Sequence, residues 1–170
     1  MNIHVRWMIH ADLDEVLEIE LASFREPWTL AEIAQRFSAI KCVAQVAEFD
    51  RRVVAYMLYE LGTCSVELGT ICVHPSARRK GVGRTLIEVL KTKLGGDRAY
   101  KTSRIRLVVS ERNLQAQQFF RSQGFLSTQL MRNYYGSESP GVAAIRMQYE
   151  RGSKSKWSLS NRLTKVGRDE

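Results

Sequence analysis

The chain has 170 residues, of which 44% are hydrophobic and 26% are charged, and its formal net charge is +8. These proportions are ordinary for a globular protein and predict one domain with a sizeable core. No uncharged run approaches the roughly 18 residues of a membrane-spanning helix, and the N-terminus does not have the pattern of a signal peptide, so a cytoplasmic location is expected. The cysteines have neither metal-like nor redox spacing and are interpreted as reduced structural thiols: Cys42, Cys64 and Cys72.

The positive charge is unevenly distributed along the chain. Half of it lies after Glu150, where six basic residues stand against two acidic ones and apolar residues are sparse. This composition predicts a single folded domain over residues 1–150 and a basic, disordered tail over residues 151–170. The tail is interpreted either as a solubilising appendage or as a weak contact for nucleic acid or the ribosome.

The first forty residues indicate one strand and two helices. A strand is predicted where polar residues alternate with Ile3, Val5, Trp7 and Ile9. Asp12-Leu13-Asp14-Glu15 is interpreted as the capping box of a helix whose apolar stripe, expected to lie in the core, is Leu13, Val16, Leu17, Leu21 and Phe24. Thr29-Leu30-Ala31-Glu32 caps a second, shorter helix. Trp28 lies between the two helices and is either a lid on the core or a wall of a substrate groove.

Three strands are predicted next, over residues 42–49, 52–61 and 65–73. The first two are rich in Val, Ala, Tyr, Phe and Leu, and the polar pair Asp50-Arg51 between them indicates a hairpin. Gly69 interrupts the third strand and predicts a bulge or a close backbone approach. Because a bulged strand bends away from its neighbour, its backbone N–H and C=O groups become free to pair with an amide-bearing ligand.

A basic loop with two glycines follows the third of these strands, and the rest of the chain is organised around it. The helix after the loop has apolar residues every four positions, namely Val82, Leu86, Leu90 and Leu94, and is expected to end at Gly95-Gly96-Asp97. Free N–H groups, the helix dipole and four cations favour a phosphate or diphosphate at its N-terminus. Leu86 stands where a dinucleotide fold needs glycine, and no Gly-Lys-Ser/Thr is present, so both common alternatives are disfavoured.

The C-terminal third predicts a further strand, a helix and two final strands. Residues 105–109 form an apolar run typical of a buried parallel strand. Asn113 caps the helix, which closes at Gly124, and the last strands span residues 125–134 and 142–149 with a Gly/Ser/Pro loop between them. The predicted order is βααβββαβαββ, a mixed α/β domain with one parallel crossover around the phosphate helix.

The loop Arg78-x-x-Gly81-x-Gly83 resembles the acetyl-CoA diphosphate signature of the GNAT superfamily of N-acetyltransferases. The predicted order of elements is similar to the GNAT fold over residues 3–149, which implies a central mixed seven-stranded sheet with flanking helices. Within the superfamily the chain most resembles ribosomal-protein-alanine N-acetyltransferases and their protein N-terminal relatives. The segments that carry this likeness are residues 26–29, 71–75, 78–84, Asn113 with Gly124-Phe125, and Met131-Arg132-Asn133-Tyr134-Tyr135.

This resemblance implies a set of site residues and acetyl-CoA as the cofactor, with no metal. The expected cofactor contacts are the backbone of Ile71, Cys72 and Val73 for the pantetheine arm, the loop residues Arg78, Arg79, Lys80, Gly81, Val82, Gly83, Arg84 and Thr85 for the diphosphate, and Asn113 and Phe120. Asn113 is also a helix N-cap by its residue type alone. The expected acceptor contacts are Trp28, Tyr134 and Tyr135, and packing at the rim of the core is the alternative for the two tyrosines.

The sequence departs from the alanine acetyltransferases at their catalytic pair. Val108 and Phe120 stand where those enzymes carry a general-base glutamate and a general-acid tyrosine, and neither can exchange a proton. If a side chain serves as the base, Glu67 is the candidate, because it lies eleven residues before Arg78, the spacing of the base in the histone-acetyltransferase branch. Glu111 and His74 are the alternatives, although a solvated turn and packing of the turn are the favoured interpretations for them.

Three functions are compatible with these features. The leading hypothesis is an acetyl-CoA-dependent N-acetyltransferase that acts on the N-terminus of a protein, with ribosomal proteins among the candidate substrates. The second is an enzyme of the same fold that acetylates a small amine. The third is a catalytically silent acyl-CoA-binding or nucleic-acid-associated module, which Val108, Phe120 and the basic tail favour.

Overall fold

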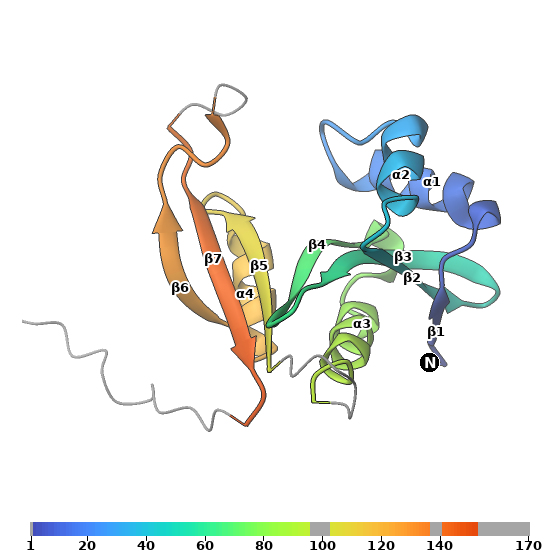
Figure 1. Cartoon of the computed structure of the whole chain (residues 1–170). Helices are drawn as coiled ribbons and strands as arrows, with labels where there is room; N and C mark the ends of the chain where they lie inside the picture. The colour runs from blue at the N-terminus through green and yellow to red at the C-terminus, as the bar shows by residue number, and fades with distance from the viewer. Residues whose placement is uncertain (1, 96–102, 137–140, 153–170) are drawn as a thin grey trace, which may run out of the picture.

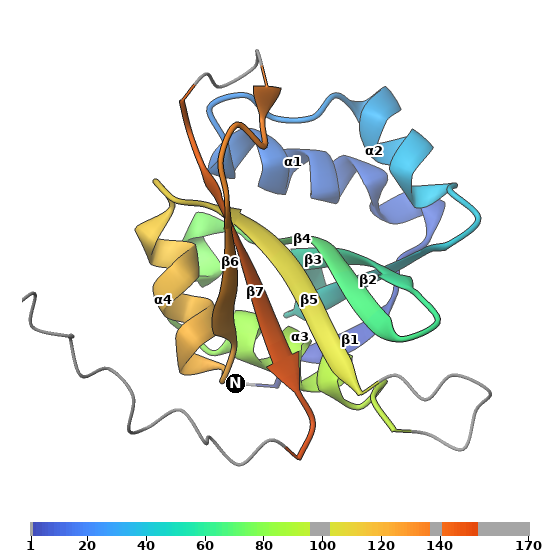
Figure 2. The same cartoon turned by 60° about the vertical axis from the view of Figure 1, so that its left-hand side comes forward.

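The computed structural model describes residues 2–95, 103–136 and 141–152. Within these residues a seven-stranded sheet has the order β1-β2-β3-β4-β5-β7-β6, and four α-helices cover it (Figure 1). Helices α1 and α2 lie on one side of the β1–β4 half of the sheet and α3 on the other, while α4 lies along the β5–β7 half (Figures 1 and 2). The predicted mixed α/β fold is therefore confirmed.

The first four strands are antiparallel. They are β1 (His4–Trp7), β2 (Cys42–Phe49), β3 (Arg52–Leu61) and β4 (Ser65–Val73). Strands β2, β3 and β4 have the bounds that the sequence predicts. The β2–β3 turn places Asp50 and Arg51 at φ angles of 51° and 63°. A two-residue hairpin of this type requires left-handed backbone at both central positions, so the hairpin predicted around this pair is confirmed.

The predicted capping box at Asp12–Glu15 is wrong. Helix α1 (Leu13–Ser23) follows a short 3-10 turn, and the Asp12 side chain does not cap it. Both Asp12 carboxylate oxygens instead accept hydrogen bonds of 2.7 Å from the guanidinium of Arg6 on β1, and Oδ2 also accepts the Ile9 N–H. A partner distant from the helix thus takes the carboxylate that the local pattern assigned to the cap.

The apolar stripe of α1 is only partly buried. Val16 and Ile19 lie in the core, but Leu21 and Phe24 are 62% and 43% exposed, so their predicted core positions are wrong. Helix α1 ends at Ser23, and Phe24 continues in extended backbone, which takes its side chain off the helical stripe. The second helix, α2 (Leu30–Phe37), has the reciprocal capping box that its sequence predicts at Thr29 and Glu32.

The second half of the sheet follows helix α3 (Val82–Lys91). Strand β5 (Arg104–Ser110) pairs in parallel with β4, which confirms the predicted crossover. Helix α4 (Leu114–Ser122) ends before Gly124, which has a φ of 86°, as predicted for a C′ glycine. The final strands are β6 (Leu126–Met131), shorter than predicted, and β7 (Ala144–Glu150).

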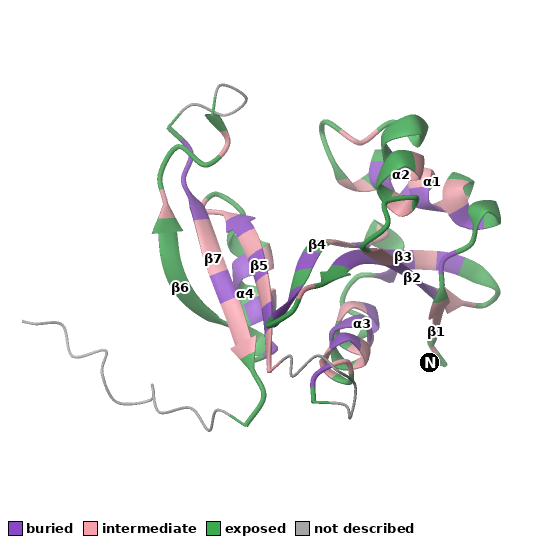
Figure 3. Ribbon diagram, viewed as in Figure 1, coloured by how far each residue is buried: buried purple, intermediate pink, exposed green. Residues whose placement is uncertain are grey.

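Two hydrophobic clusters cover the two faces of the sheet. The larger one joins α3 and α4 to the strands through residues such as Leu86, Leu90 and Phe120. The smaller one joins α1 and α2 to the sheet and includes Val16, Ile33 and Tyr56. Buried residues accordingly line the sheet and the inner sides of the helices, whereas β6 is exposed over most of its length (Figure 3).

Several predictions concern residues outside the described ranges. Helix α3 ends at Lys91 and the chain turns up to Gly95, so Gly96 and Asp97 of the predicted helix end lie outside. Residues 153–170 of the predicted tail also lie outside. The first tail residue, Arg151, is fixed in the domain, because its N–H donates to Ser103 O at 2.9 Å and its guanidinium to Leu94 O. No helix in the described part of the chain is long and apolar enough to cross a membrane.

Candidate active site

The two central strands separate at Gly69. Strand β4 pairs with β5 only from Ser65 to Leu68, opposite Arg104 to Leu107, and the strands then diverge (Figure 1). On the other side of β4, Leu58 pairs with Thr70 and Tyr59 with Leu68, which leaves Gly69 as the extra residue of a bulge. The bulge predicted from this glycine is confirmed. Beyond it, the edge of β4 that faces β5 presents backbone N–H and C=O groups to the space between the strands.

The N-terminus of α3 lies just after this open segment of β4. Gly81 is the N-cap residue and has a φ of 87°, a left-handed conformation that glycine adopts without strain. The first helical backbone hydrogen bond runs from Thr85 N to Gly81 O at 3.0 Å. The N–H groups of the three preceding helical residues, residues 82–84, therefore remain available to a ligand. With the helix dipole, they have the geometry that the predicted anion-binding site requires.

Three cations surround this N-terminus. Arg79, Lys80 and Arg84 are exposed, and within residues 2–95, 103–136 and 141–152 none of them forms a salt bridge. Arg78 behaves differently, because its Nε donates to Val73 O at 2.9 Å and its Nη2 to Ser23 Oγ at 3.0 Å. Its guanidinium thus ties β4 to the end of α1, and its predicted contact with the diphosphate stays a prediction.

Helix α4 follows β5, the strand on the other side of the opening. Asn113 caps it, since its Oδ1 accepts the Ala116 N–H at 3.0 Å, and its predicted cofactor contact stays a prediction. Phe120 is 6% exposed, and its ring packs edge-on against Phe119 and Phe125. Core packing is therefore the contact that the structure shows for Phe120, while Val108 on β5 is half-buried.

Glu67 lies on the paired part of β4, two residues before the bulge. Its side chain is 49% exposed, and its Oε1 accepts a hydrogen bond of 2.6 Å from Ser65 Oγ. The guanidinium of Arg106 on β5 lies 3.8 Å from the same oxygen. A half-exposed carboxylate at the closed end of the opening has access to water, which a direct or water-mediated base requires.

The two alternative bases have structural partners. Glu111 follows β5, and its Oε1 accepts the Ala143 N–H at 2.8 Å, while its own N–H donates to Ala143 O at 2.9 Å. These bonds join the end of β5 to the start of β7. His74 caps a 3-10 turn, since its Nδ1 accepts the Ser76 N–H at 3.3 Å. The interpretation of His74 as packing its turn fits these contacts.

The predicted acceptor residues come from two different parts of the fold. Trp28 is half-buried against the smaller core cluster, and the guanidinium of Arg36 lies 4.1 Å from its ring centroid. Tyr134 is 52% exposed and stacks in a T-shape on Tyr135, with ring centroids 5.1 Å apart. Burial raises the pKa of Tyr135. Their roles in acceptor binding stay predictions.

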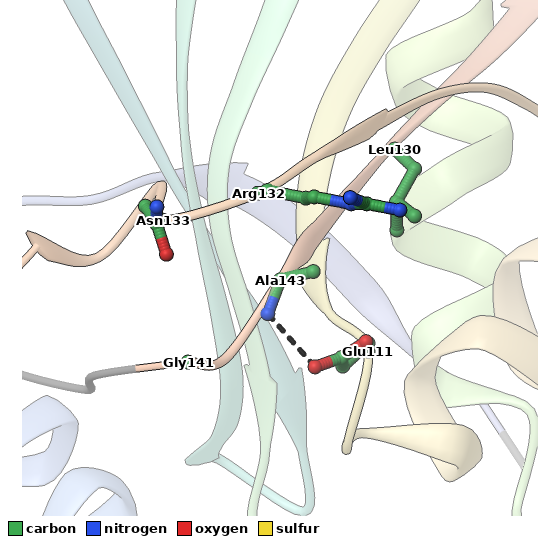
Figure 4. Close-up of a pocket in the computed structure, with 6 residues that line it drawn as sticks. All are labelled: Glu111, Leu130, Arg132, Asn133, Gly141 and Ala143. Atoms are coloured by element: carbon green, nitrogen blue, oxygen red, sulfur yellow. Dashed lines mark hydrogen bonds between the residues drawn. The ribbon is translucent and has the colours of Figure 1, made fainter.

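A hollow of about 300 Å³ lies at the end of β5, where Asn133, the residue before the tyrosine pair, lines it. Its lining residues come from the ends of β5, β6 and β7 and are Glu111, Leu130, Arg132, Asn133, Gly141 and Ala143 (Figure 4). Sequence reasoning missed Leu130, Gly141 and Ala143, because only the pairing of β6 with β7 brings them to the end of β5. Arg132 and Asn133 belong to residues 131–135, and the resemblance of this segment to the alanine acetyltransferases is the sequence signal that points to them.

Neither a metal cluster nor a disulfide is present in the described part of the chain. No three His, Cys, Asp or Glu side chains there are placed to hold a metal ion. Cys42, Cys64 and Cys72 are free thiols. Burial raises the pKa of the Cys72 thiol, which lies on the open segment of β4, so this cysteine stays protonated and structural near neutral pH.

Comparison with known proteins identifies the class that this arrangement defines. The model of the Acetyltransferase (GNAT) family matches residues 13–125, so the chain belongs to this family and is an acetyltransferase. Its sequence is 27% identical over 142 residues to an uncharacterized N-acetyltransferase of Methanocaldococcus jannaschii, a match that spans 84% of this chain and 90% of that protein.

Solved structures of similar fold include enzymes with different acceptors. The ribosomal-protein-S18-alanine N-acetyltransferase of Escherichia coli is 22% identical, with a TM-score of 0.73 over 88% of this chain and 94% of that one. Ard1 of Thermoplasma volcanium is 23% identical, with a TM-score of 0.74 over 88% and 98%. A phosphinothricin acetyltransferase of Sinorhizobium meliloti, solved with acetyl-CoA, is 24% identical, with a TM-score of 0.70 over 88% and 89%.

GNAT acetyltransferases use acetyl-CoA, and the site described above fits this molecule. The N-terminus of α3 supplies N–H donors and cations of the kind that a diphosphate requires, and the open edge of β4 supplies partners for amide groups. Val108 and Phe120 cannot exchange a proton, so an acid or base in the reaction has to come from another group.

Proposed function

We propose that the protein transfers the acetyl group of acetyl-CoA to the N-terminal α-amine of a protein, with ribosomal proteins as the first candidates and the cytoplasm as the place of action. The observation that carries this proposal is the turn after β6, where Asn133 has a φ of 55° and presents the stacked pair Tyr134 and Tyr135. The turn lies at the end of the molecule toward which β4 and β5 open (Figure 1). The name of the Escherichia coli structural relative supports the same class of acceptor.

The cofactor supplies an acetyl thioester, and the residues of this chain bind and orient it. The N–H groups of Val82 and Gly83, with the charges of Arg79, Lys80 and Arg84, hold the diphosphate in this proposal. The backbone of residues 71–73 aligns the pantetheine arm along the open edge of β4. A backbone N–H at the bulge can polarise the thioester carbonyl, as preorganised donors do in acyl transfer.

An α-amine suits a site that lacks the glutamate and tyrosine pair expected from the alanine acetyltransferases. With a reference pKa of about 7.7–8.0, roughly 10% of α-amines are neutral at pH 7, whereas a lysine amine of pKa about 10.4 is neutral in about 0.04% of molecules. An N-terminal α-amine therefore needs much less help from a base than a lysine amine does. In this proposal the proton that the amine loses goes to Glu67, directly or through water, because Glu67 is the half-exposed carboxylate on β4. Coenzyme A leaves as a thiolate when the C–S bond breaks, and water protonates it.

A small amine with an acidic group is the second candidate acceptor. The hollow of about 300 Å³ has the volume of a small-molecule site, and the side chains of Glu111 and Arg132 line it with opposite charges. Such a pair of charges suits an amino acid, which carries both an ammonium and a carboxylate group.

A panel of acceptors with acetyl-CoA, read by thiol release, separates these candidates. Peptides with free N-termini, including those of ribosomal proteins, are compared with the same peptides blocked at the N-terminus and with amino acids. We expect turnover of the free peptides and none of the blocked peptides, even where these contain lysine. Turnover of amino acids alone would replace the proposed acceptor with the small amine.

A further inference from the structure

The last turn of α1 carries a buried carboxylate that the steps above do not use. Glu20 is 3% exposed and, in the part of the chain that the structure describes, forms no salt bridge. An ionised carboxylate inside a protein is costly unless several donors satisfy it. The hydrogen bonds of Glu20 therefore decide what this residue does.

The two carboxylate oxygens of Glu20 accept hydrogen bonds from two different parts of the fold. Oε2 accepts the Trp28 N–H at 3.1 Å, and Trp28 belongs to the loop between α1 and α2. Oε1 accepts the hydroxyl of Tyr56, which lies on β3 and is fully buried. The Glu20 carboxylate thus joins the loop of residues 24–29 to strand β3.

Tyr56 continues this connection to the open segment of β4. It pairs with Cys72 across β3 and β4, and Cys72 lies beyond Leu68, the last residue of β4 that pairs with β5. Burial, and then the hydrogen bond to Glu20, raise the pKa of Tyr56, so its hydroxyl stays protonated and remains a donor to the carboxylate. The connection from Trp28 through Glu20 to Tyr56 therefore reaches the opening.

A second connection runs from the same helical turn to the end of the open segment. Ser23 Oγ accepts the Arg78 guanidinium at 3.0 Å, and Arg78 Nε donates to Val73 O at 2.9 Å. The last turn of α1 is consequently tied to β4 next to Cys72, through Tyr56, and at Val73, and Cys72 and Val73 both lie in the segment that no longer pairs with β5.

We propose that Glu20 is a positioning residue for the acceptor, which through Trp28 and Tyr56 fixes the distance between the loop of residues 24–29 and the open segment of β4. The proposal rests on the proposed function in one respect, that this loop is a wall of the acceptor groove. The acceptor amine has to be held close to the thioester carbonyl, and a misplacement of about 1 Å can lower the rate about a hundredfold. Glu20 acts through its partners and does not touch the reacting atoms.

The test compares two Tyr→Phe variants on the same strand. Tyr56→Phe keeps the ring and removes the hydroxyl that donates to Glu20. Tyr59→Phe removes a hydroxyl from a tyrosine that is equally buried, 1% exposed, but packs in the other core cluster. We expect Tyr56→Phe to lower kcat/KM for the acceptor at least tenfold and to leave the Kd of acetyl-CoA within a factor of two, while Tyr59→Phe leaves both unchanged.

Substitution of Glu20 separates positioning from simple stability. Glu20→Leu removes both acceptor oxygens and should reproduce the loss seen in Tyr56→Phe, whereas Glu20→Gln keeps a carbonyl oxygen as acceptor and should retain part of the rate. Equal kinetics of Tyr56→Phe and Tyr59→Phe, or a loss in acetyl-CoA affinity that matches the loss in rate, would overturn the proposal. If the wild-type protein turns over no peptide, the proposed function fails instead, and the same comparison is made with the accepted amine.

Discussion

Gly83 in α3 lies directly against the ring of Phe119 in α4. A Cβ atom at Gly83 would come within 3.1 Å of Phe119 Cζ and 3.3 Å of Cε2, both tighter than ordinary contacts between side chains. The two helices approach each other where α3 presents its free N–H groups. Glycine is thus needed at this position for helix packing, in addition to any approach of a ligand to the backbone.

We expect Gly83→Ala to weaken acetyl-CoA binding about tenfold and to lower the free energy of unfolding by about 1 kcal/mol, because the added methyl group must push Phe119 or α3 aside. Calorimetric titration and urea unfolding measure the two effects. In Gly83→Ala/Phe119→Leu the smaller side chain should recover part of both losses. A variant that binds as tightly as the wild-type protein would show that α3 shifts without consequence for the site.

The sheet and its hairpin could be predicted because their signals are local. Residues 42–49, 52–61 and 65–73 combine strand-forming residues with clear breakers, and Gly69 marks its own bulge. The capping box at Asp12 failed for the opposite reason. Arg6, on a different element, competes for the same carboxylate, and a local pattern contains no information about such a partner.

The candidate site divides in the same way. The glycine loop and the N-terminus of α3 are one continuous segment, so the sequence predicts their anion-binding geometry. The connection between Glu20 and Tyr56 joins residues 36 positions apart, and the hollow beside Asn133 depends on how β6 pairs with β7. Such arrangements come from the tertiary fold, and a single sequence does not indicate them.

Asn113→Asp should separate the two roles of Asn113. Aspartate caps a helix about as well as asparagine, so the free energy of unfolding should change by less than about 0.5 kcal/mol. Its negative charge should raise the Kd of acetyl-CoA several-fold at low salt, and less at high salt, if the side chain lies next to the cofactor. Asn113→Ala, which removes the cap, should instead cost about 1 kcal/mol. An unchanged Kd in Asn113→Asp would leave this residue as a helix cap alone.

Glu67→Gln should lower kcat at least tenfold with the Kd of acetyl-CoA unchanged, because glutamine keeps the shape of the side chain but accepts no proton. Glu60 provides the matched control, since it lies opposite Glu67 on β3 and is exposed. Glu60→Gln should retain the wild-type rate. Steady-state thiol release measures both variants, and equal rates would remove Glu67 from the mechanism.

Arg6 makes stability depend on pH through Asp12 and Glu48. Its hydrogen bonds hold the pKa of both carboxyl groups below their ordinary values. A carboxyl group whose pKa is lower in the folded state stabilises the protein above its unfolded pKa, about 3.9 for Asp, and this contribution is lost as the pH falls through the folded pKa. We therefore expect Arg6→Gln to lower the free energy of unfolding at pH 7 by about 1–3 kcal/mol.

The difference between Arg6→Gln and the wild-type protein should shrink on acidification, since the wild-type carboxylates also bind protons once the pH falls through their lowered pKa values. Urea unfolding at pH 7, 4 and 3 measures this difference. Arg52→Gln is the control, because Arg52 is exposed at the start of β3 and forms no salt bridge in the described part of the chain. It should match the wild-type protein at every pH. A difference for Arg6→Gln that stays constant from pH 7 to 3 would mean that the guanidinium acts through packing, and that its charge is not what stabilises the start of α1.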